Sequence, residues 1–177
     1  MESNTYCAFL RGVNVKGTNM KMAEACAVFQ KTGMENVSSV LASGNILFTS
    51  SKPKNELKAL LEKAMSSHFN YDAFLFLKNK IEIGTIFHKN PFEKHPDFHI
   101  YSFVGTTGIE NTLMEVYENA KKVEGENALI IASNFYWKVP KGNTLGSEFG
   151  KILGRKNLKD KFTSRNLNTI EKILKKI

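Results

Sequence analysis

Hydrophobic positions along the first half of the chain alternate in short runs and recur at helical spacing in longer ones. This pattern predicts six elements. They are a strand at residues 6–10, a helix at 20–32, a hairpin at 37–41 and 46–49, a helix from Pro53, and a strand at 71–77. Strand, helix, strand, strand, helix, strand is the order of the ferredoxin-like fold, the split βαβ arrangement.

The second half of the chain repeats part of this pattern after a connector at residues 81–97, which includes a short helix. The predicted elements are a strand at 100–104, a helix at 111–122, a hairpin at 128–132 and 135–139, a helix near 145–153, and a final helix at 165–177. The hairpin sequence Ala132-Ser133-Asn134 resembles the earlier Ala-Ser-Gly-Asn at 42–45, which indicates a degenerate internal repeat.

We therefore predict an α+β protein with two ferredoxin-like halves, antiparallel sheets and helices packed on them. The first half spans residues 1–80, the connector 81–97, and the second half 98–177. The apolar stripe of the last helix predicts that this helix docks on the core with its lysines outward.

Composition narrows the class of protein. With 177 residues and 42% hydrophobic content, the chain is expected to bury a core of its own. No apolar stretch approaches the ~20 residues that cross a bilayer. Arg11 places a charge in the first apolar run, whereas the apolar core of a signal peptide is uncharged. We expect a cytoplasmic protein without membrane association. Cys7 and Cys26 are far apart in sequence, so we expect core thiols and no disulfide framework or zinc site.

The net charge of +8 is concentrated near the C-terminus. Residues 151–177 carry nine Lys or Arg and two Asp or Glu. Clustered basic charge attracts phosphates and nucleic acid.

A first polar cluster, Arg11-Gly12-Val13-Asn14-Val15-Lys16-Gly17, lies between the first strand and the first helix. Phosphate-binding loops in α/β proteins occupy this kind of position. The glycines match neither GxGxxG nor the P-loop spacing, so dinucleotide or P-loop chemistry gains no support. Ser43 and Asn45 would add a hydroxyl and an amide at the same sheet end, although a plain hairpin turn also explains them.

A second polar cluster, Thr163-Ser164-Arg165-Asn166, is expected at the head of the last helix, with Thr163 or Ser164 as the N-cap. Arg165 in a first helical turn opposes the positive end of the helix dipole. That placement makes sense if an anion lies between them. The alternative is that Arg165 faces solvent or pairs with a distant carboxylate.

Catalytic, metal and cofactor motifs are missing from the sequence. His95 and His99 have helical spacing, but Pro96 between them disfavours a helix and the HExxH glutamate is absent, so no metal is expected. The chain shows neither a nucleophile elbow nor an obvious carboxylate pair. We expect no cofactor, and the sequence leaves open whether the protein is an enzyme and what its catalytic residues would be.

Four separated motifs resemble one bacterial family, catalogued as domain of unknown function sixteen ninety-seven. They are the segments at residues 9–15, 21–23, 43–48 and 163–169, and they occur in the family's order. The resemblance spans nearly the whole chain and implies a two-part α+β protein of bacterial cytosolic type with no assigned activity. The chain departs from the family pattern at Lys16, Ala42 and Leu167, where glycine, glutamine and tryptophan are expected.

These observations lead to one main hypothesis and two alternatives. The main hypothesis is that a phosphate-bearing or other anionic ligand binds between the two halves. Its polar lining would be Arg11, Asn14, Lys16, Ser43, Asn45, Arg165 and Asn166, with the arginines as bidentate clamps. The alternatives are a nucleic-acid-binding module that uses the basic C-terminal segment, and a structural or dimerising protein without a ligand. Homo-oligomers are compatible with each.

Overall fold

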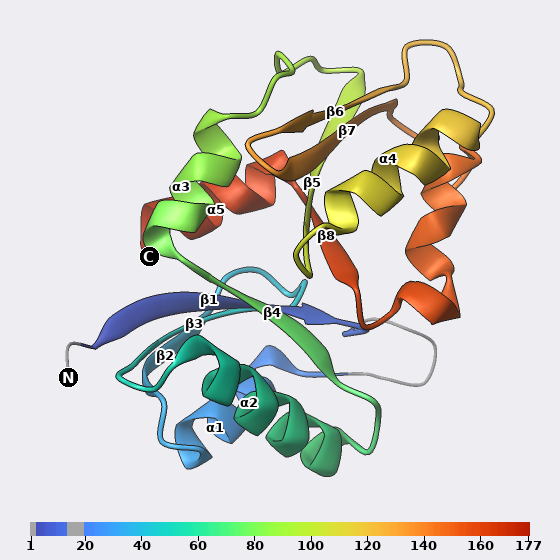
Figure 1. Ribbon diagram of the computed structural model, residues 1–177. Helices are drawn as coiled ribbons and strands as arrows, with labels where there is room; N and C mark the ends of the chain where they lie inside the picture. The colour runs from blue at the N-terminus through green and yellow to red at the C-terminus, as the bar shows by residue number, and fades with distance from the viewer. Residues whose placement is uncertain (1–2, 14–19) are drawn as a thin grey trace. The chain divides into compact units, whose positions relative to one another are not determined.

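The computed structural model describes residues 3–13 and 20–177, and the chain divides into two compact units. The first unit comprises Met1–Ile83 together with Lys172–Ile177, and the second comprises Gly84–Glu171. The division falls inside two helices, α3 and α5, whose bounds follow below. Each unit is described by itself (Figure 1).

The first unit is built around one four-stranded sheet and two helices. Its elements are β1 (Asn4–Arg11), α1 (Met22–Lys31), β2 (Glu35–Ser39), β3 (Asn45–Ser50), α2 (Lys54–Phe69) and β4 (Phe74–Asn79), followed by α3 (Lys80–His88). Figure 1 shows α1 and α2 side by side on one face of this sheet.

The second unit has the same kind of sheet but a different set of helical segments. Its elements are β5 (Phe98–Gly105), α4 (Ile109–Asn119), β6 (Asn127–Ile131), β7 (Asn134–Pro140), the 3-10 segments η1 (Phe149–Gly154) and η2 (Lys156–Leu158), and β8 (Phe162–Asn166), followed by α5 (Leu167–Lys176).

Both sheets are antiparallel and share one topology. The strand order is β2-β3-β1-β4 in the first unit and β6-β7-β5-β8 in the second. In each, the first strand along the chain lies between the third and the fourth. The predicted fold class, two ferredoxin-like halves with helices on antiparallel sheets, is confirmed.

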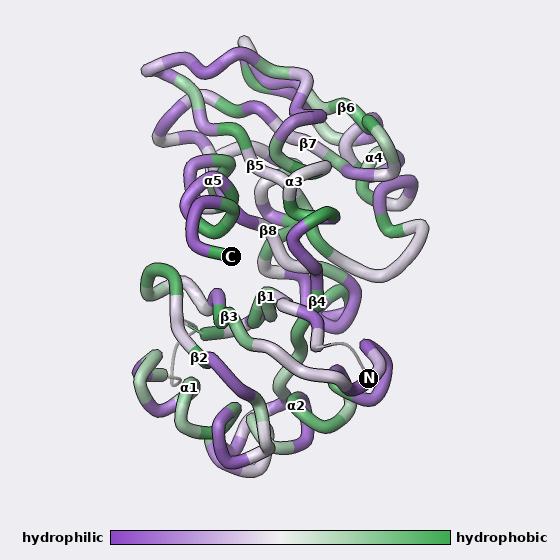
Figure 2. Tube along the Cα trace, turned by 90° about the vertical axis from the view of Figure 1, so that its left-hand side faces the viewer, coloured by the Kyte–Doolittle hydropathy of each residue, from purple (hydrophilic) through white to green (hydrophobic). Residues whose placement is uncertain are grey.

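The core of the first unit is mainly aliphatic on the helical side. Leu57, Leu61 and Met65, spaced four apart on α2, are fully buried against the sheet. Phe29 of α1 packs edge-on against Phe48 of β3, with ring centroids 5.5 Å apart. Figure 2 shows hydrophobic and hydrophilic stretches alternating along the trace, as expected for elements with one buried face.

The core of the second unit is mainly aromatic. Phe149 of η1 lies among the rings of Phe103, Phe135 and Trp137, with centroid distances of 6.0, 5.5 and 5.2 Å. The Trp137 indole donates to Glu126 Oε1 at 2.8 Å, so its buried N–H is satisfied. Where the first unit has the long helix α2, the second unit has the short 3-10 segment η1, whose Phe149 packs against aromatic side chains of the strands.

Two helix predictions near the C-terminus need correction. Where a helix was expected at residues 145–153, the structure has the 3-10 segment η1. This stretch contains two glycines, Gly146 and Gly150, which disfavour a regular α-helix. The final helix was expected from Arg165 but begins at Leu167, because residues 162–166 form strand β8 along β5. The pairing partner of β8 lies about sixty residues earlier in the chain, so local periodicity gave no sign of it.

Candidate functional site

Of the residues predicted to bind the anion, Arg11, Ser43 and Asn45 lie in the first unit. Arg11 is the last residue of β1 and is partly buried. Asn14 and Lys16 lie outside the described residues. Asn45 is fully buried, and its amide donates to Val40 O and to Ser43 Oγ, both at 2.9 Å. These two hydrogen bonds hold the turn between β2 and β3, which favours an architectural role for Asn45.

Arg165 does not occupy the first turn of a helix. It lies in β8 opposite Ser102 of β5, is buried, and donates to Thr163 Oγ1 and Ser164 O at 2.8 Å. The prediction that Thr163 or Ser164 caps the helix is therefore wrong. Thr and Ser are common both at helix caps and in strands, and here the strand pairing decides. The inference of an anion from the position of Arg165 on the helix dipole loses its basis.

The N-cap of α5 is Asn166, the last residue of β8. Its Oδ1 accepts a hydrogen bond from the Asn168 backbone N–H at 3.0 Å. Its Nδ2 lies 3.1 Å from His99 Nδ1. Because Oδ1 is already an acceptor, Nδ2 is the donor to His99, and the neutral imidazole then carries its hydrogen on Nε2. One asparagine thus caps the helix and sets the histidine tautomer.

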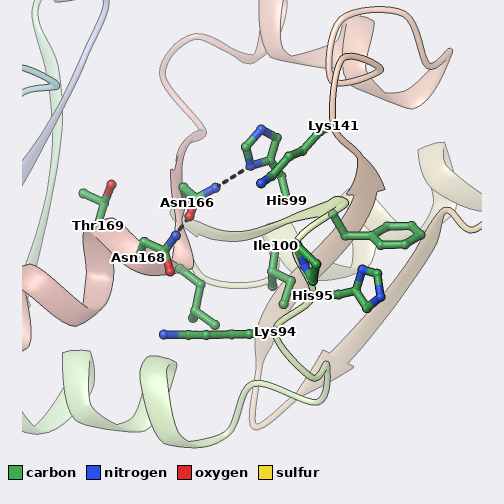
Figure 3. A pocket seen from close by; sticks show the side chains of 11 residues that line it. Lys94, His95, His99, Ile100, Lys141, Asn166, Asn168 and Thr169 are labelled. Atoms are coloured by element: carbon green, nitrogen blue, oxygen red, sulfur yellow. Dashed lines mark hydrogen bonds between the residues drawn. The ribbon is translucent and has the colours of Figure 1, made fainter.

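A pocket of about 540 Å³ opens beside this cap, within the second unit. Its lining consists of residues from the loop before β5, from β5, from the end of β7 and from the start of α5: Lys94, His95, Pro96, Phe98, His99, Ile100, Lys141, Asn166, Leu167, Asn168 and Thr169. In Figure 3 the side chains of Lys141, His99 and Asn166 point toward one another. None of these eleven described residues is acidic.

The charges around the pocket are unequally neutralised. Lys94 forms an ion pair with Glu171 Oε2 at 2.6 Å. His95 Nδ1 accepts from the Asp97 N–H at 3.2 Å. Lys141 is exposed, and its ammonium group makes no ion pair with any residue that the structure describes. Together with the positive end of the α5 dipole, this gives the pocket a positive character.

Comparisons with known proteins identify the family. The model for a protein family of unknown function, DUF1697, matches residues 3–136. The chain belongs to this family. The expectation from the four motifs is confirmed.

The solved structures that are similar to this chain support its fold and assign it no activity. The conserved bacterial protein SP0830 from Streptococcus pneumoniae is similar, with a TM-score of 0.78 and 22% identity over 98% of each chain. This similarity shows a shared fold. A protein of unknown function from Galdieria sulphuraria matches with a TM-score of 0.30 and 13% identity, over 93% of this chain and 98% of the other. No curated protein matches the chain.

The residues that the structure describes contain neither a candidate membrane span nor a candidate metal site. No helix among them is long and apolar enough to span a bilayer. Among the same residues, no group of three or more His, Cys, Asp or Glu side chains is arranged to hold a metal ion.

Sequence reasoning found one pocket residue of the DUF1697 protein, Asn166, and missed its neighbours. The spacing of His95 and His99 suggests only a metal site, and no sequence motif marks Lys94 or Lys141. These residues converge because β5 pairs with both β7 and β8, over separations of about forty and sixty residues. One sequence signal could have pointed to the pocket. An asparagine ends the fourth strand of each unit, Asn79 in the first and Asn166 in the second.

Proposed function

We propose that this protein binds a small phosphate-bearing or other anionic ligand in the pocket of the second unit. Support comes from two helix starts that occupy equivalent places in the two units. Asn79 ends β4 and its Oδ1 accepts from the Glu82 N–H at 2.9 Å at the start of α3. Asn166 ends β8 and caps α5, where its Oδ1 accepts from the Asn168 N–H, two residues after the cap rather than three. Each is the last residue of the fourth strand in its unit.

The start of α3 contains a built-in anion. Glu82, three residues after the cap, accepts from the Asn79 N–H at 2.8 Å and from Lys54 Nζ at 2.7 Å, and Lys78 Nζ lies 3.3 Å away. Burial alone would raise the pKa of this carboxyl, but the hydrogen bonds from Lys54 and Asn79 and the charges of Lys78 and Lys54 lower it below its ordinary value. A carboxylate between two lysines therefore stabilises this helix start.

The start of α5 has similar surroundings but no carboxylate. The residue three positions after its cap is Thr169, which lines the pocket together with Lys94 and Lys141. The second unit thus has a helix N-terminus and two lysines from other elements, of which Lys94 is already paired with Glu171 and Lys141 has no ion pair among the described residues. An anion from solution would take the place that Glu82 fills at α3. This difference carries the proposal.

The pocket offers polar contacts for the anionic group of such a ligand and apolar contacts for its organic part. Lys141 provides an ammonium group, and His99 Nε2–H and the first-turn N–H groups of α5 provide donors. Pro96 and Ile100 provide apolar surface for an organic part. A volume of about 540 Å³ exceeds what a bare phosphate needs and lies within the usual range of small-molecule pockets.

Titration calorimetry with inorganic phosphate, pyrophosphate and adenosine monophosphate tests the proposal. We expect Lys141→Gln to weaken binding of a phosphate-bearing probe by about tenfold or more, the usual effect of losing a charged hydrogen bond. Lys89→Gln removes the same charge from an exposed site outside the pocket and should change little. If no probe binds, or if both variants bind equally well, the proposal fails.

Thr169→Glu is a sharper test, because it supplies the carboxylate that α3 already has. The variant should abolish binding of the phosphate probe and raise the free energy of unfolding by about 0.5 kcal/mol or more. Thr169→Gln has similar size without the charge and should retain binding. Unchanged phosphate affinity in Thr169→Glu would place any anion site elsewhere.

A second candidate function, nucleic-acid binding, is favoured by the exposed cations on and around η1 and η2. They are Lys151, Arg155, Lys156, Lys159 and Lys161. Contacts from all five to phosphates would give a log–log salt slope of about −4 to −5 on duplex DNA. Fluorescence anisotropy with a labelled duplex between 50 and 200 mM salt measures this slope. Affinity that does not depend on salt, or no binding, excludes this candidate.

A further inference from the structure

The two sheets have four edge strands, and they differ in how they are protected from pairing with another chain. The strand orders place β2 and β4 at the edges of the first sheet and β6 and β8 at the edges of the second. An edge strand carries backbone N–H and C=O groups without a partner on its outer side, and natural proteins protect such edges with charges, prolines or bulges.

Three of the four edges carry such protection. In β2 the register shifts between Glu35 and Ser38, and Glu35 adds a charge. Lys78 lies in β4 and Arg165 in β8. A charged side chain or an irregular register discourages the approach of another strand.

Strand β6 has none of these features. Its sequence, Asn-Ala-Leu-Ile-Ile, contains no charged residue, proline or glycine, and all five residues pair in regular register with β7. Ala128 is buried in the core, whereas Leu129 and Ile131 on the other face are 39% and 36% exposed. Among the described strands, β7 is the only one that pairs with β6.

We propose that β6 is a self-association edge, where it pairs antiparallel with β6 of a second copy of this chain. A two-fold axis at Leu129 would join the two four-stranded sheets into one continuous sheet of eight strands. In this register Leu129 faces its own counterpart, Ala128 faces Ile130, and Asn127 faces Ile131. On the exposed face, Leu129 would then lie beside Leu129 of the partner, and Ile131 beside the partner's Asn127.

The chemistry of the strand favours its own copy as the occupant. No like charges meet in the antiparallel register, because the strand has none. A charged extended peptide would find no complementary side chain on β6, whereas an uncharged apolar strand finds both backbone partners and apolar neighbours. Five residues make a small interface, so the dimer is expected to be weak, with a dissociation constant on the order of 100 µM.

Sedimentation velocity on the full chain over a range of concentrations tests the proposal. We expect concentration-dependent dimers that are lost in Leu129→Lys and in Ile131→Lys, with at least a tenfold rise in dissociation constant. Both side chains are partly exposed, so both variants should fold, and thermal unfolding checks this. Leu145→Lys adds the same charge at a residue that is 74% exposed outside the strands and should leave the dimer intact.

Cross-linking tests the register separately. Leu129→Cys should form a covalent dimer under mild oxidation, because the two thiols would face each other across the axis, whereas Leu145→Cys should not. A chain that stays monomeric at millimolar concentration, with equal cross-linking of the two cysteine variants, would overturn the proposal. So would a dimer that survives both lysine substitutions on β6, since another surface would then hold it.

Discussion

The two units of this protein share a strand order but cover their sheets in different ways. In the first unit, α2 places three aliphatic side chains on the sheet from a regular sixteen-residue helix. In the second unit, η1 lies between the third and fourth strands, as α2 does in the first. It contributes Phe149 and Ile152 to a core that consists largely of aromatic rings. The fold therefore requires apolar volume over the sheet face at this point and accepts more than one backbone form to supply it.

The units also differ at the helix that follows the fourth strand. At α3, Glu82 satisfies the helix start from within the chain. At α5 the equivalent residue, Thr169, has no carboxylate, and the side chain of Asn166 caps the helix. The pocket opens at this helix start. Under the proposed function, an anion site would occupy the place in one copy of a repeated fold where a stabilising side chain of the other copy is missing.

The largest expected effect on the free energy of unfolding tests whether η1 supplies the apolar packing over its sheet that α2 supplies in the first unit. Phe149→Ala should lower the free energy of unfolding by about 4 kcal/mol, because it leaves a cavity among four rings, and Leu61→Ala should cost about 3 kcal/mol. Urea unfolding followed by tryptophan fluorescence measures the first directly, since Trp137 lies against Phe149. Leu145→Ala, in the same stretch but exposed, is the control. If Phe149→Ala lowered the free energy of unfolding by less than about 1 kcal/mol, η1 would not contribute substantially to the packing of the core.

A smaller effect is expected at the α3 start, and it depends on pH. Glu82→Gln should cost about 1 kcal/mol at pH 7. The pKa of Glu82 is lowered in the folded state, so its contribution is full above the unfolded pKa of about 4.3 and is lost as the pH falls through the folded value. Urea unfolding from pH 7 to pH 3 should show wild type and variant converging at the acid end.

Glu56→Gln provides the matched control for this pH series. Glu56 lies in the first turn of α2 and is exposed. Its substitution should change stability less than Glu82→Gln at pH 7 and should show a weaker pH dependence. A gap between wild type and Glu82→Gln that stays constant down to pH 3 would show that the carboxylate charge at the α3 start is irrelevant.

The sequence was sufficient for the parts of the fold that depend on near neighbours. Periodicity identified α1, α2, both hairpins and the first strand of each unit. It misassigned residues 162–166, because a five-residue polar strand with one buried arginine looks like a helix cap until its partner β5 is known. The pocket was out of reach for the same reason. Lys94, His99 and Lys141 meet Asn166 only because β5 pairs with both β7 and β8.

The smallest expected effect compares the turns of the two hairpins. Ala132 and Ser133 join β6 to β7 with φ of 49° and 58°, the left-handed values that a two-residue turn of type I′ requires. Alanine is strained there and glycine is not, so Ala132→Gly should raise the free energy of unfolding by about 0.5–1 kcal/mol.

Ala42 supplies the matched control in the first hairpin. It is exposed in the turn between β2 and β3, where Leu41 and Gly44 have the positive φ and Ala42 does not. Ala42→Gly should therefore lower stability by about 0.5 kcal/mol, because it adds only freedom to the unfolded chain. Thermal unfolding of the two variants should shift in opposite directions. Shifts of the same sign would show that the resemblance between residues 42–45 and 132–134 extends to backbone conformation, contrary to the φ values.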